Sequence, residues 1–175
     1  VSKFDRAAPN GTGKYKAGAN YAGGLLATLN AQELGANEAL YLDSAQNRYI
    51  DEAGSANIVI FTKDQKLITP SSEAILPSIT RRSVMELAES ELSLPTEARP
   101  IELRTEFANF QEMAACGTAA VIAPVGKIWF DNDWHTVFQG GESVGPIMSE
   151  LYELLVGIQR GEKEDKFGWL YSIDL

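Results

Sequence analysis

The chain has 175 residues, of which 45% are hydrophobic, a formal net charge of −9 and an isoelectric point near 4.6. This length suits one domain with a core of ordinary size. The acidic balance argues against nucleic acid or an anionic membrane as a partner. No apolar run approaches the roughly 20 residues of a membrane span, and no signal peptide is recognisable.

The chain has one cysteine, Cys116, and one histidine, His135. A single cysteine excludes an internal disulfide and fits a reducing compartment. A single histidine argues against a histidine-based metal site and against a Ser/His/Asp triad. We therefore expect a cytoplasmic protein with no metal, no nucleic-acid partner and no membrane partner.

The first residues, 1–13, carry the turn signal Pro9-Asn10-Gly11 and little periodicity, which predicts a loop or linker. Because the sequence begins at Val1 in loop-like residues, we expect the C-terminal part of a longer protein. Helical spacing then predicts a helix from Asn20 to about Leu34 that ends at Gly35. Its apolar residues near one face are Tyr21, Leu25, Leu26, Leu29 and Leu34. The strands predicted next are Glu38–Asp43, Arg48–Glu52, Ala56–Thr62 and Leu67–Thr69, the last two as a hairpin.

The second half of the chain continues to mix helices and strands. It is predicted to contain a helix from Ser78 to Glu91 capped by Ser78, a strand from Pro100 to Leu103, a helix from Thr105 to Ala114 capped by Thr105, strands Ala119–Ala123, Lys127–Phe130 and Trp134–Phe138, and a helix from Val144 to Arg160. No repeat and no internal boundary is visible. We expect one mixed α/β domain over residues 1–175.

The stretch GTGKYKAGANY, residues 11–21, surrounds two lysines with small residues. Small neighbours allow a backbone or a planar ligand to come close. A lysine enclosed by apolar groups loses proton affinity and becomes a nucleophilic amine. Lys14 fits a solvated position on the loop, whereas Lys16 lies nearer to the predicted helix. Lys16 is therefore the candidate nucleophile, although lysine is most often a solvated charge.

Glu52 follows a predicted strand and precedes the small residues Ala53-Gly54-Ser55-Ala56. A carboxylate at this position is either a solvated charge at a strand end or an acid held against a positive or protonated partner. The small residues leave space for a flat ring over the backbone.

Two turns offer anion sites. Ser78-Ile79-Thr80 opens a helix, where free N–H groups and the positive end of the helix dipole attract an anion. The alternative is simple helix capping. Gly117-Thr118-Ala119 is a second turn with N–H groups and a hydroxyl. An amine nucleophile, a carboxylate and two anion-binding turns are what pyridoxal phosphate requires.

Four motifs carry a resemblance to a known family. The chain resembles the branched-chain amino acid aminotransferases, which are fold-type IV pyridoxal-phosphate enzymes, in the order and context of Lys16–Tyr21 (KAGANY), Glu52–Asn57 (EAGSAN), Leu76–Arg81 (LPSITR) and Gly117–Ala120 (GTAA). The similarity extends from Arg6-Ala7-Ala8-Pro9 to the terminal Glu164–Leu170. It implies the large C-terminal domain of that fold, a mixed β-sheet or pseudo-barrel flanked by helices.

The resemblance also implies roles for single residues. Lys16 would be the Schiff-base lysine and the general base of the proton shift. Tyr21 would bond the phenolic oxygen of the cofactor, and Glu52 its pyridine nitrogen. The remaining implied contacts are Ile79, Thr80 and Thr118 with the phosphate, Thr118 and Ala119 with the substrate carboxylate, and Ser55 and Leu76 with the ring.

The chain departs from the family pattern in small ways. Ala19 occupies a position where the family usually has a second glycine, and Ser78 one where the family often has glycine before Ile-Thr-Arg. Both replacements affect tight backbone geometry. The CxxC redox pair of some relatives is absent, because Ala120 and Ala123 leave no thiols near Thr118.

The resemblance also implies a missing N-terminal domain that supplies a phosphate-binding arginine, much of the substrate pocket and part of a homodimer interface. The implied reaction is amino transfer from leucine, isoleucine or valine to 2-oxoglutarate. The alternatives are a D-amino acid aminotransferase, an aminodeoxychorismate lyase, or a catalytically silent isolated domain. For this chain alone we expect a cofactor site that is empty or holds only an adventitious anion near Thr80 and Thr118.

Overall fold

A computed structural model describes residues 1–8, 10–138 and 143–173. Its centre is a mixed five-stranded sheet of strand order β5-β4-β3-β6-β7, in which only the β4–β5 pair is parallel among the described residues. The strands of this sheet are β3 (Asn57–Thr62), β4 (Leu67–Pro70), β5 (Thr96–Arg99), β6 (Phe110–Gly117) and β7 (Val121–Pro124). Two further antiparallel pairs are β1 (Leu40–Leu42) with β2 (Ile50–Ala53), and β8 (Lys127–Phe130) with β9 (Asp133–Thr136).

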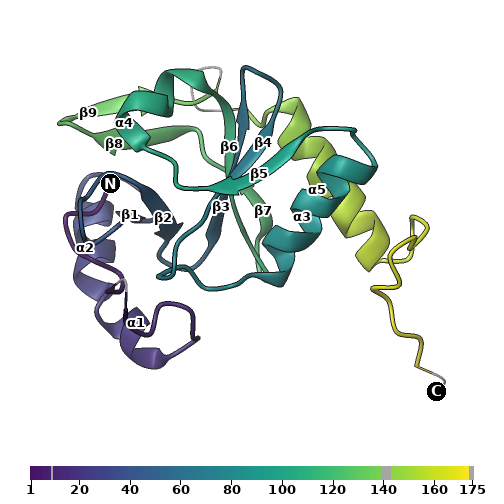
Figure 1. Ribbon diagram of the computed structural model, residues 1–175, viewed down its shortest axis with the longest axis horizontal. Coiled ribbons are helices and arrows are strands. Elements are labelled where there is room, and N and C mark those ends of the chain that lie inside the picture. Colours follow the sequence, from purple (N-terminus) through teal and green to yellow (C-terminus); the bar gives the residue numbers. More distant parts are fainter. Residues whose placement is uncertain (9, 139–142, 174–175) are drawn as a thin grey trace.

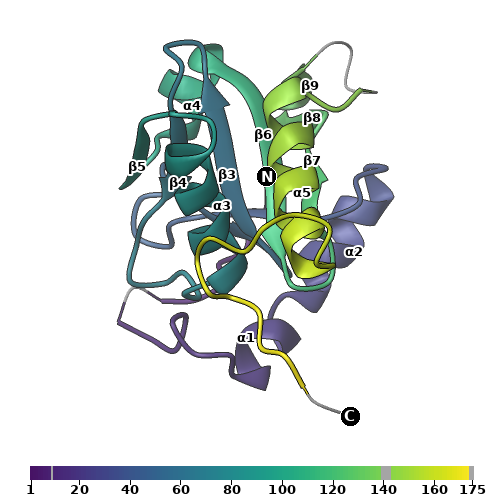
Figure 2. The same cartoon turned by 90° about the vertical axis from the view of Figure 1, so that its right-hand side faces the viewer.

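Two helices, α3 and α5, cover one face of the central sheet. In Figures 1 and 2, α3 and α5 lie side by side against it, while α1 and α2 project from the opposite side of the molecule. The helices and the 3-10 turn are α1 (Gly18–Ala22), α2 (Leu25–Glu33), α3 (Ile79–Ser90), α4 (Leu103–Glu106), η1 (Phe107–Asn109) and α5 (Pro146–Gln159). The mixed α/β class and the flanking helices expected from the sequence are confirmed.

Strand β3 is buried on both faces and divides the core in two. Val59 and Phe61 point to the cluster shared with α3 and α5. Ile58 and Ile60 point to the cluster shared with the β1–β2 and β8–β9 pairs. This alternation follows from the two-residue period of a strand. A strand between two apolar layers has a continuous apolar sequence, and residues 58–61, IVIF, form such a run.

Several predicted elements are confirmed with small changes of boundary. The hairpin β3–β4, the helix α3 with Ser78 as its cap, and the strand pair β8–β9 are all present. The Ser78 Oγ accepts the N–H of Arg81 at 3.1 Å. Gly35 follows α2 with φ +78°, a conformation that glycine adopts without steric cost. Residues 1–8 and 10–13 lie outside regular elements as expected, and Pro9 of the predicted turn lies outside the described residues.

The predicted helix from Thr105 to Ala114 is wrong. A short helix, α4, begins at Leu103 after Glu102, and the chain from Phe110 onward is strand β6. The Ala, Glu and Met residues of this segment have high helix propensity. Pairing with β3 on one side and β7 on the other overrides that propensity, because both faces of β6 pack into the core.

The strand predicted at Pro100–Leu103 is also wrong. The strand is β5, Thr96–Arg99, which pairs in parallel with β4. Pro100 has no N–H to donate, so the ladder ends before it. Leu103 instead begins α4 and is fully buried.

The helix predicted from Asn20 to Leu34 is divided in two. It breaks at Gly23-Gly24, where a Cβ on Gly24 would approach the Tyr41 hydroxyl at 2.9 Å. The helix α2 buries Ala27, with Ala31 beside it, against Tyr41. The face predicted to be apolar is exposed in the described chain; its residues are Tyr21, Leu25, Leu26, Leu29 and Leu34.

The final helix α5 receives its N-terminal cap from a strand. Its N-cap residue is Gly145, which has no side chain. The buried Glu112 of β6 accepts the N–H of Ile147 at 3.2 Å and that of Met148 at 2.8 Å. A negative charge is favourable at a helix N-terminus. A Cβ on Gly145 would collide with the Glu112 carboxyl group, so glycine is required there.

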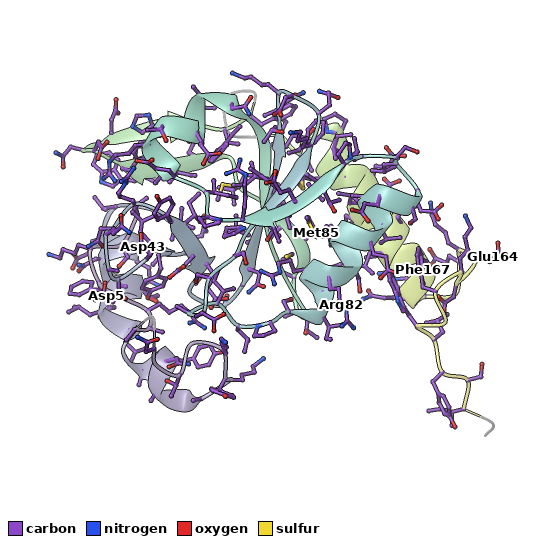
Figure 3. The ribbon with its side chains drawn as sticks, in the orientation of Figure 1. Asp5, Asp43, Arg82, Met85, Glu164 and Phe167 are labelled. Atoms are coloured by element: carbon purple, nitrogen blue, oxygen red, sulfur yellow. The ribbon has the colours of Figure 1, made fainter. Side chains whose placement is uncertain are left out.

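The last segment extends beyond α5. Phe167 stacks on Trp169 and packs at the edge of the helix-side core, while Glu164 is exposed, and Figure 3 labels Glu164 and Phe167 on this segment. Within the described residues, no helix is long and apolar enough to cross a membrane.

Candidate functional site

Glu52 lies near the end of β2 and is almost completely buried, with 3% of its surface exposed. Its Oε1 lies 2.5 Å from Nη2 of Arg6 and accepts the N–H of Leu76 at 3.1 Å. Its Oε2 accepts a hydrogen bond from Nδ2 of Asn57 at 2.6 Å. The carboxyl group is therefore held by three donors from three separate segments. The interpretation of Glu52 as a solvated charge at a strand end does not hold for the folded chain.

The protonation of Glu52 is finely balanced. Burial raises the pKa of this carboxyl to about 7, because water no longer solvates its charge, while the Arg6 guanidinium acts in the opposite direction. Asp51 on the same strand raises the pKa further, and Arg81 of α3 lowers it. A carboxyl group with a strongly shifted pKa is characteristic of functional sites, although ion pairs in the core produce such shifts too.

The turn after Glu52 lies beside the end of β6. The N–H of Ala53 donates to the carbonyl of Ala56 at 2.9 Å, which closes the turn. Asn57 is opposite Cys116 in the β3–β6 register. The next residue, Gly117, consequently approaches the carbonyl of Ser55, where an added Cβ would lie at 3.8 Å. Two of the sequence motifs thus meet at one edge of the sheet.

The start of α3 is joined to the same carboxylate. The N–H of Leu76 bonds to Glu52, and the helix begins three residues later at Ile79. Ile79 is exposed and Thr80 is half-buried. The first turn of an α-helix leaves backbone N–H groups without partners inside the helix, and these groups attract anions. Arg82 is exposed on this turn, where Figure 3 labels it, with Met85 one turn further along α3.

The lysine loop, defined as residues 11–20, lies against the segment that precedes Leu76. Asn20 fixes its shape, because Nδ2 donates to the carbonyls of Thr12 and Tyr15 at 2.8 and 2.9 Å. Lys14 pairs with Glu73. Gly13 is buried against Ala74 so closely that a Cβ would overlap the Ala74 carbonyl.

A hollow of about 240 Å³ lies between the lysine loop and the start of α3. Its lining includes Lys14, Glu73, Pro77 and Arg81. A larger groove of about 1260 Å³ lies between α2, β1 and the β8–β9 pair. None of the predicted site residues lines this larger groove within the described part of the chain, so the candidate site is elsewhere.

The predicted site residues differ in how closely the structure joins them. Glu52 and Leu76 are in direct contact, and Ser55 lies beside Gly117, which precedes Thr118. Within the described residues, Lys16 makes no hydrogen bond or ion pair with Glu52. The other predicted site residues with exposed side chains are Lys16, Tyr21, Ser55, Ile79, Thr118 and Ala119. The Ser55 hydroxyl donates to Glu38 at 2.8 Å.

Two residues at this site were not singled out in the sequence. Arg6 is the buried partner of Glu52, and Asn57 is the donor to its second oxygen. Asn57 is the last residue of the motif EAGSAN, so its position five residues after Glu52 could have indicated a contact between the two side chains. Arg6 lies 46 positions before Glu52 in the chain. The two side chains meet only in the folded protein, so no local sequence pattern indicated their contact.

The site offers unmet hydrogen-bonding capacity where pyridoxal phosphate would need it. The Oδ1 of Asn57 is buried without a hydrogen-bond partner among the described residues. The Oε2 of Glu52 accepts one donor, and a carboxylate oxygen accepts two. Free N–H groups at the start of α3 suit a phosphate. The residues present therefore fit a planar ring with a protonated nitrogen and an anionic tail.

Comparison with known proteins defines the class. The family profile "Amino-transferase class IV" matches residues 1–128. The chain belongs to the class IV aminotransferases.

The relatives within this class carry a more specific name. The chain is 45% identical over 173 residues to the branched-chain-amino-acid aminotransferase of Helicobacter pylori (strain J99), covering 99% of this chain and 49% of that protein. It is also similar to the branched-chain amino acid aminotransferase of Escherichia coli, with a TM-score of 0.85 and 35% identity over 99% of this chain and 54% of that one.

A third similar structure is the branched-chain amino acid aminotransferase of Thermobaculum terrenum, with a TM-score of 0.77 and 29% identity, covering 93% of this chain and 50% of that one. That protein has been solved in its PLP form, the holo form. The chain thus spans about half the length of the relatives it matches.

Proposed function

We propose that this chain is the lysine-bearing half of a pyridoxal-phosphate enzyme that transfers the amino group of leucine, isoleucine or valine to 2-oxoglutarate. The observation that carries the proposal is the buried Glu52 carboxyl, held by three donors, one of which is the Leu76 N–H just before α3. The relatives named above support the substrate class. Their length supports a second half that this chain does not contain.

The cofactor would be held by residues from all four motifs. The N–H groups of Ile79 and Thr80 at the start of α3 would bind its phosphate together with Thr118. Glu52 would accept a hydrogen bond from the protonated ring nitrogen, and Tyr21 would donate to the phenolic oxygen. Ser55 and Leu76 would pack at the ring. When bound, pyridoxal phosphate supplies an electron sink for charge that develops at the substrate Cα.

Lys16 would supply the amine and the proton transfers. Its Nζ is a nucleophile when neutral, and the same atom would take a proton from the substrate Cα and return it at the neighbouring position. The N–H groups at Thr118-Ala119 would bind the substrate carboxylate. Small residues around Lys16 leave room for both cofactor and substrate.

The test is an assay with leucine and 2-oxoglutarate on the full-length polypeptide, with formation of glutamate as the measured product. We expect turnover with all three branched-chain amino acids. A full-length protein that turns over D-alanine or aminodeoxychorismate but not leucine would assign a different substrate to the same fold.

A further inference from the structure

Arg6 makes two contacts that connect the N-terminal loop to the site. Its Nη2 lies 2.5 Å from Oε1 of Glu52, and its Nη1 donates to the carbonyl of Ala74 at 3.0 Å. The side chains of Arg6 and Glu52 are only 5% and 4% exposed. Removing two charges from water is costly and is offset only when geometry and additional hydrogen bonds are good. The additional hydrogen bonds from Leu76 and Asn57 to Glu52, and from Arg6 to Ala74, help to offset this cost.

We propose that Arg6 is a positioning residue for the candidate site, holding Glu52 as a carboxylate whose Oε2 remains open to a donor from a ligand. The inference rests on the proposed function, since it assigns Arg6 a role on the carboxylate proposed to bind the ring nitrogen. It concerns a residue of the N-terminal loop that does not itself touch the cofactor or the substrate.

The hydrogen bonds around Glu52 explain why one oxygen stays open. Arg6 and the Leu76 N–H together fill Oε1. Asn57 supplies a single donor to Oε2, which leaves one lone pair of that oxygen free. The amide oxygen of Asn57 also lacks a partner among the described residues. The unmet capacity is therefore on the Asn57 side of the carboxylate, away from Arg6.

Among the groups that face Glu52, Arg6 is the one that most strongly opposes its protonation. Asp51 on β2 repels the carboxylate, and Asp51 is itself bound by the Ser72 hydroxyl at 2.8 Å. Arg81 of α3 attracts it, but its Nη1 donates to the Pro70 carbonyl at 3.0 Å. Arg6 is the cation in direct contact. Without it, burial and Asp51 would favour the protonated acid, which no longer offers a full negative charge to a ring N–H.

The test follows the Glu52 carboxyl directly, in the cofactor-free chain, by ¹³C NMR titration of labelled glutamate, with the signal assigned by its loss in Glu52→Gln. In Arg6→Met we expect the titration midpoint of Glu52 to rise by about one to three pH units, the effect of removing an adjacent opposite charge. Arg6→Lys keeps a positive charge and should give a smaller rise. Arg99→Met removes a different Arg–Glu pair, with Glu106, and should leave the midpoint in place.

A Glu52 midpoint that is equal in the wild type, Arg6→Lys and Arg6→Met would overturn the inference. If Arg6→Met does not fold, the comparison of Arg6→Lys with the wild type still decides it, because the shorter ammonium cannot reproduce both guanidinium contacts. This readout requires no catalysis, so it stands even if the assay with leucine fails.

A second readout is the pH profile of kcat/KM in the full-length enzyme. The acidic limb should move to higher pH in Arg6→Lys, since that limb reports the ionisation of an essential group in the free enzyme. An active wild type with an unmoved limb in Arg6→Lys would reject the role of Arg6 while leaving the proposed function intact.

Discussion

Two lysines stand two positions apart in the loop before α1, and their surroundings differ. Lys14 is tied to Glu73, whereas Lys16 forms no ion pair within the described residues. The amine of Lys14 is occupied by its carboxylate partner, whereas the exposed side chain of Lys16 can turn toward a ligand. The residue environment therefore favours Lys16 for chemistry and Lys14 for fixing the loop.

We predict that Lys16→Ala lowers kcat of the full-length enzyme by at least about a hundredfold, the lower range for loss of a positioned acid–base group. Lys14→Ala, the matched control, should retain activity within about tenfold. Borohydride reduction of cofactor-loaded protein followed by peptide mapping should place the adduct on Lys16. An adduct on Lys14 would contradict the assignment.

Glu52→Gln should remove most of the activity of the full-length enzyme, because a neutral amide cannot hold the ring nitrogen protonated. Each tenfold loss in rate corresponds to about 1.4 kcal/mol of barrier. Glu102→Gln, which removes a carboxylate paired with Arg48 at the surface, is the control and should retain the wild-type rate. Circular dichroism must show an intact fold in both variants. A loss below about threefold in Glu52→Gln would count against its role.

Glu52 also makes the stability of the chain depend on pH. Its pKa is raised to about 7 in the folded state from an ordinary value of 4.5. The folded state therefore binds a proton more tightly than the unfolded state does. The resulting stability is fully present below about pH 4.5 and is lost as the pH rises through about 7.

Urea denaturation at pH 5, 6, 7 and 8 should show this component as a decrease in the free energy of unfolding with rising pH. In Glu52→Gln the decrease should be smaller, because the amide does not titrate. The slope against pH is the readout, since Arg6 loses its partner in this variant and the absolute stability falls at every pH. Identical slopes in the two proteins would refute the shifted pKa.

At the scale of elements, the sequence predicted correctly the β3–β4 hairpin and the cap of α3, which depend on residues close together in the chain. The β3–β4 hairpin has an apolar run, a turn at Asp64-Gln65 and a second apolar run, and the structure contains it. Ser78 caps α3 as its position suggested. The strand β6 was missed because FQEMAACG has helical composition, and only its two neighbouring strands determine its state.

The candidate site divides in the same way. Glu52, Thr80 and Thr118 stand in short motifs whose small residues and turns are visible in the sequence. Arg6 stands in a loop without periodicity, and its function as a partner depends on a contact across 46 positions. No local pattern reports such a contact, because it arises from the packing of the N-terminal loop on β2 and Ala74.

The cap of α5 yields a prediction at the element scale. Glu112→Ala should lower the free energy of unfolding by about 1.5–3 kcal/mol, the usual range for hydrogen bonds to a charged group. Two backbone N–H groups, of Ile147 and Met148, lose their acceptor in this variant. Glu150→Ala removes an exposed carboxylate of the same helix and serves as control. Equal urea midpoints for the two variants would show that Glu112 does not cap the helix.

At the scale of the molecule, the decisive fact is that the chain spans about half the length of its relatives. We predict that the chain alone folds but shows no measurable transamination of leucine. Misplacing reacting groups by about 1 Å can cost on the order of a hundredfold in rate, and the loss of the site residues proposed to lie in the other half should cost more. The measurement compares glutamate formation by this chain and by the full-length enzyme at equal concentration.

Measuring cofactor binding together with folding tests separately whether the chain folds and whether its site is functional. Purified chain incubated with pyridoxal phosphate should show weak binding or none by absorbance, while its circular dichroism shows the helices and strands of the fold. Robust turnover of leucine by the chain alone, after host aminotransferase has been excluded, would contradict the prediction.

The attachment of α5 to β6 through Glu112 has a consequence for the order in which the chain folds. The helix lacks an N-terminal cap of its own, so its first turn becomes stable only when β6 has been placed beside β3. Residues 110–117 and 146–159 should therefore form one cooperative unit, despite the segment of chain that separates them. In native-state hydrogen exchange, the amides of Ile147 and Met148 should open together with those of β6, with a higher free energy of opening than the amides at the C-terminal end of α5.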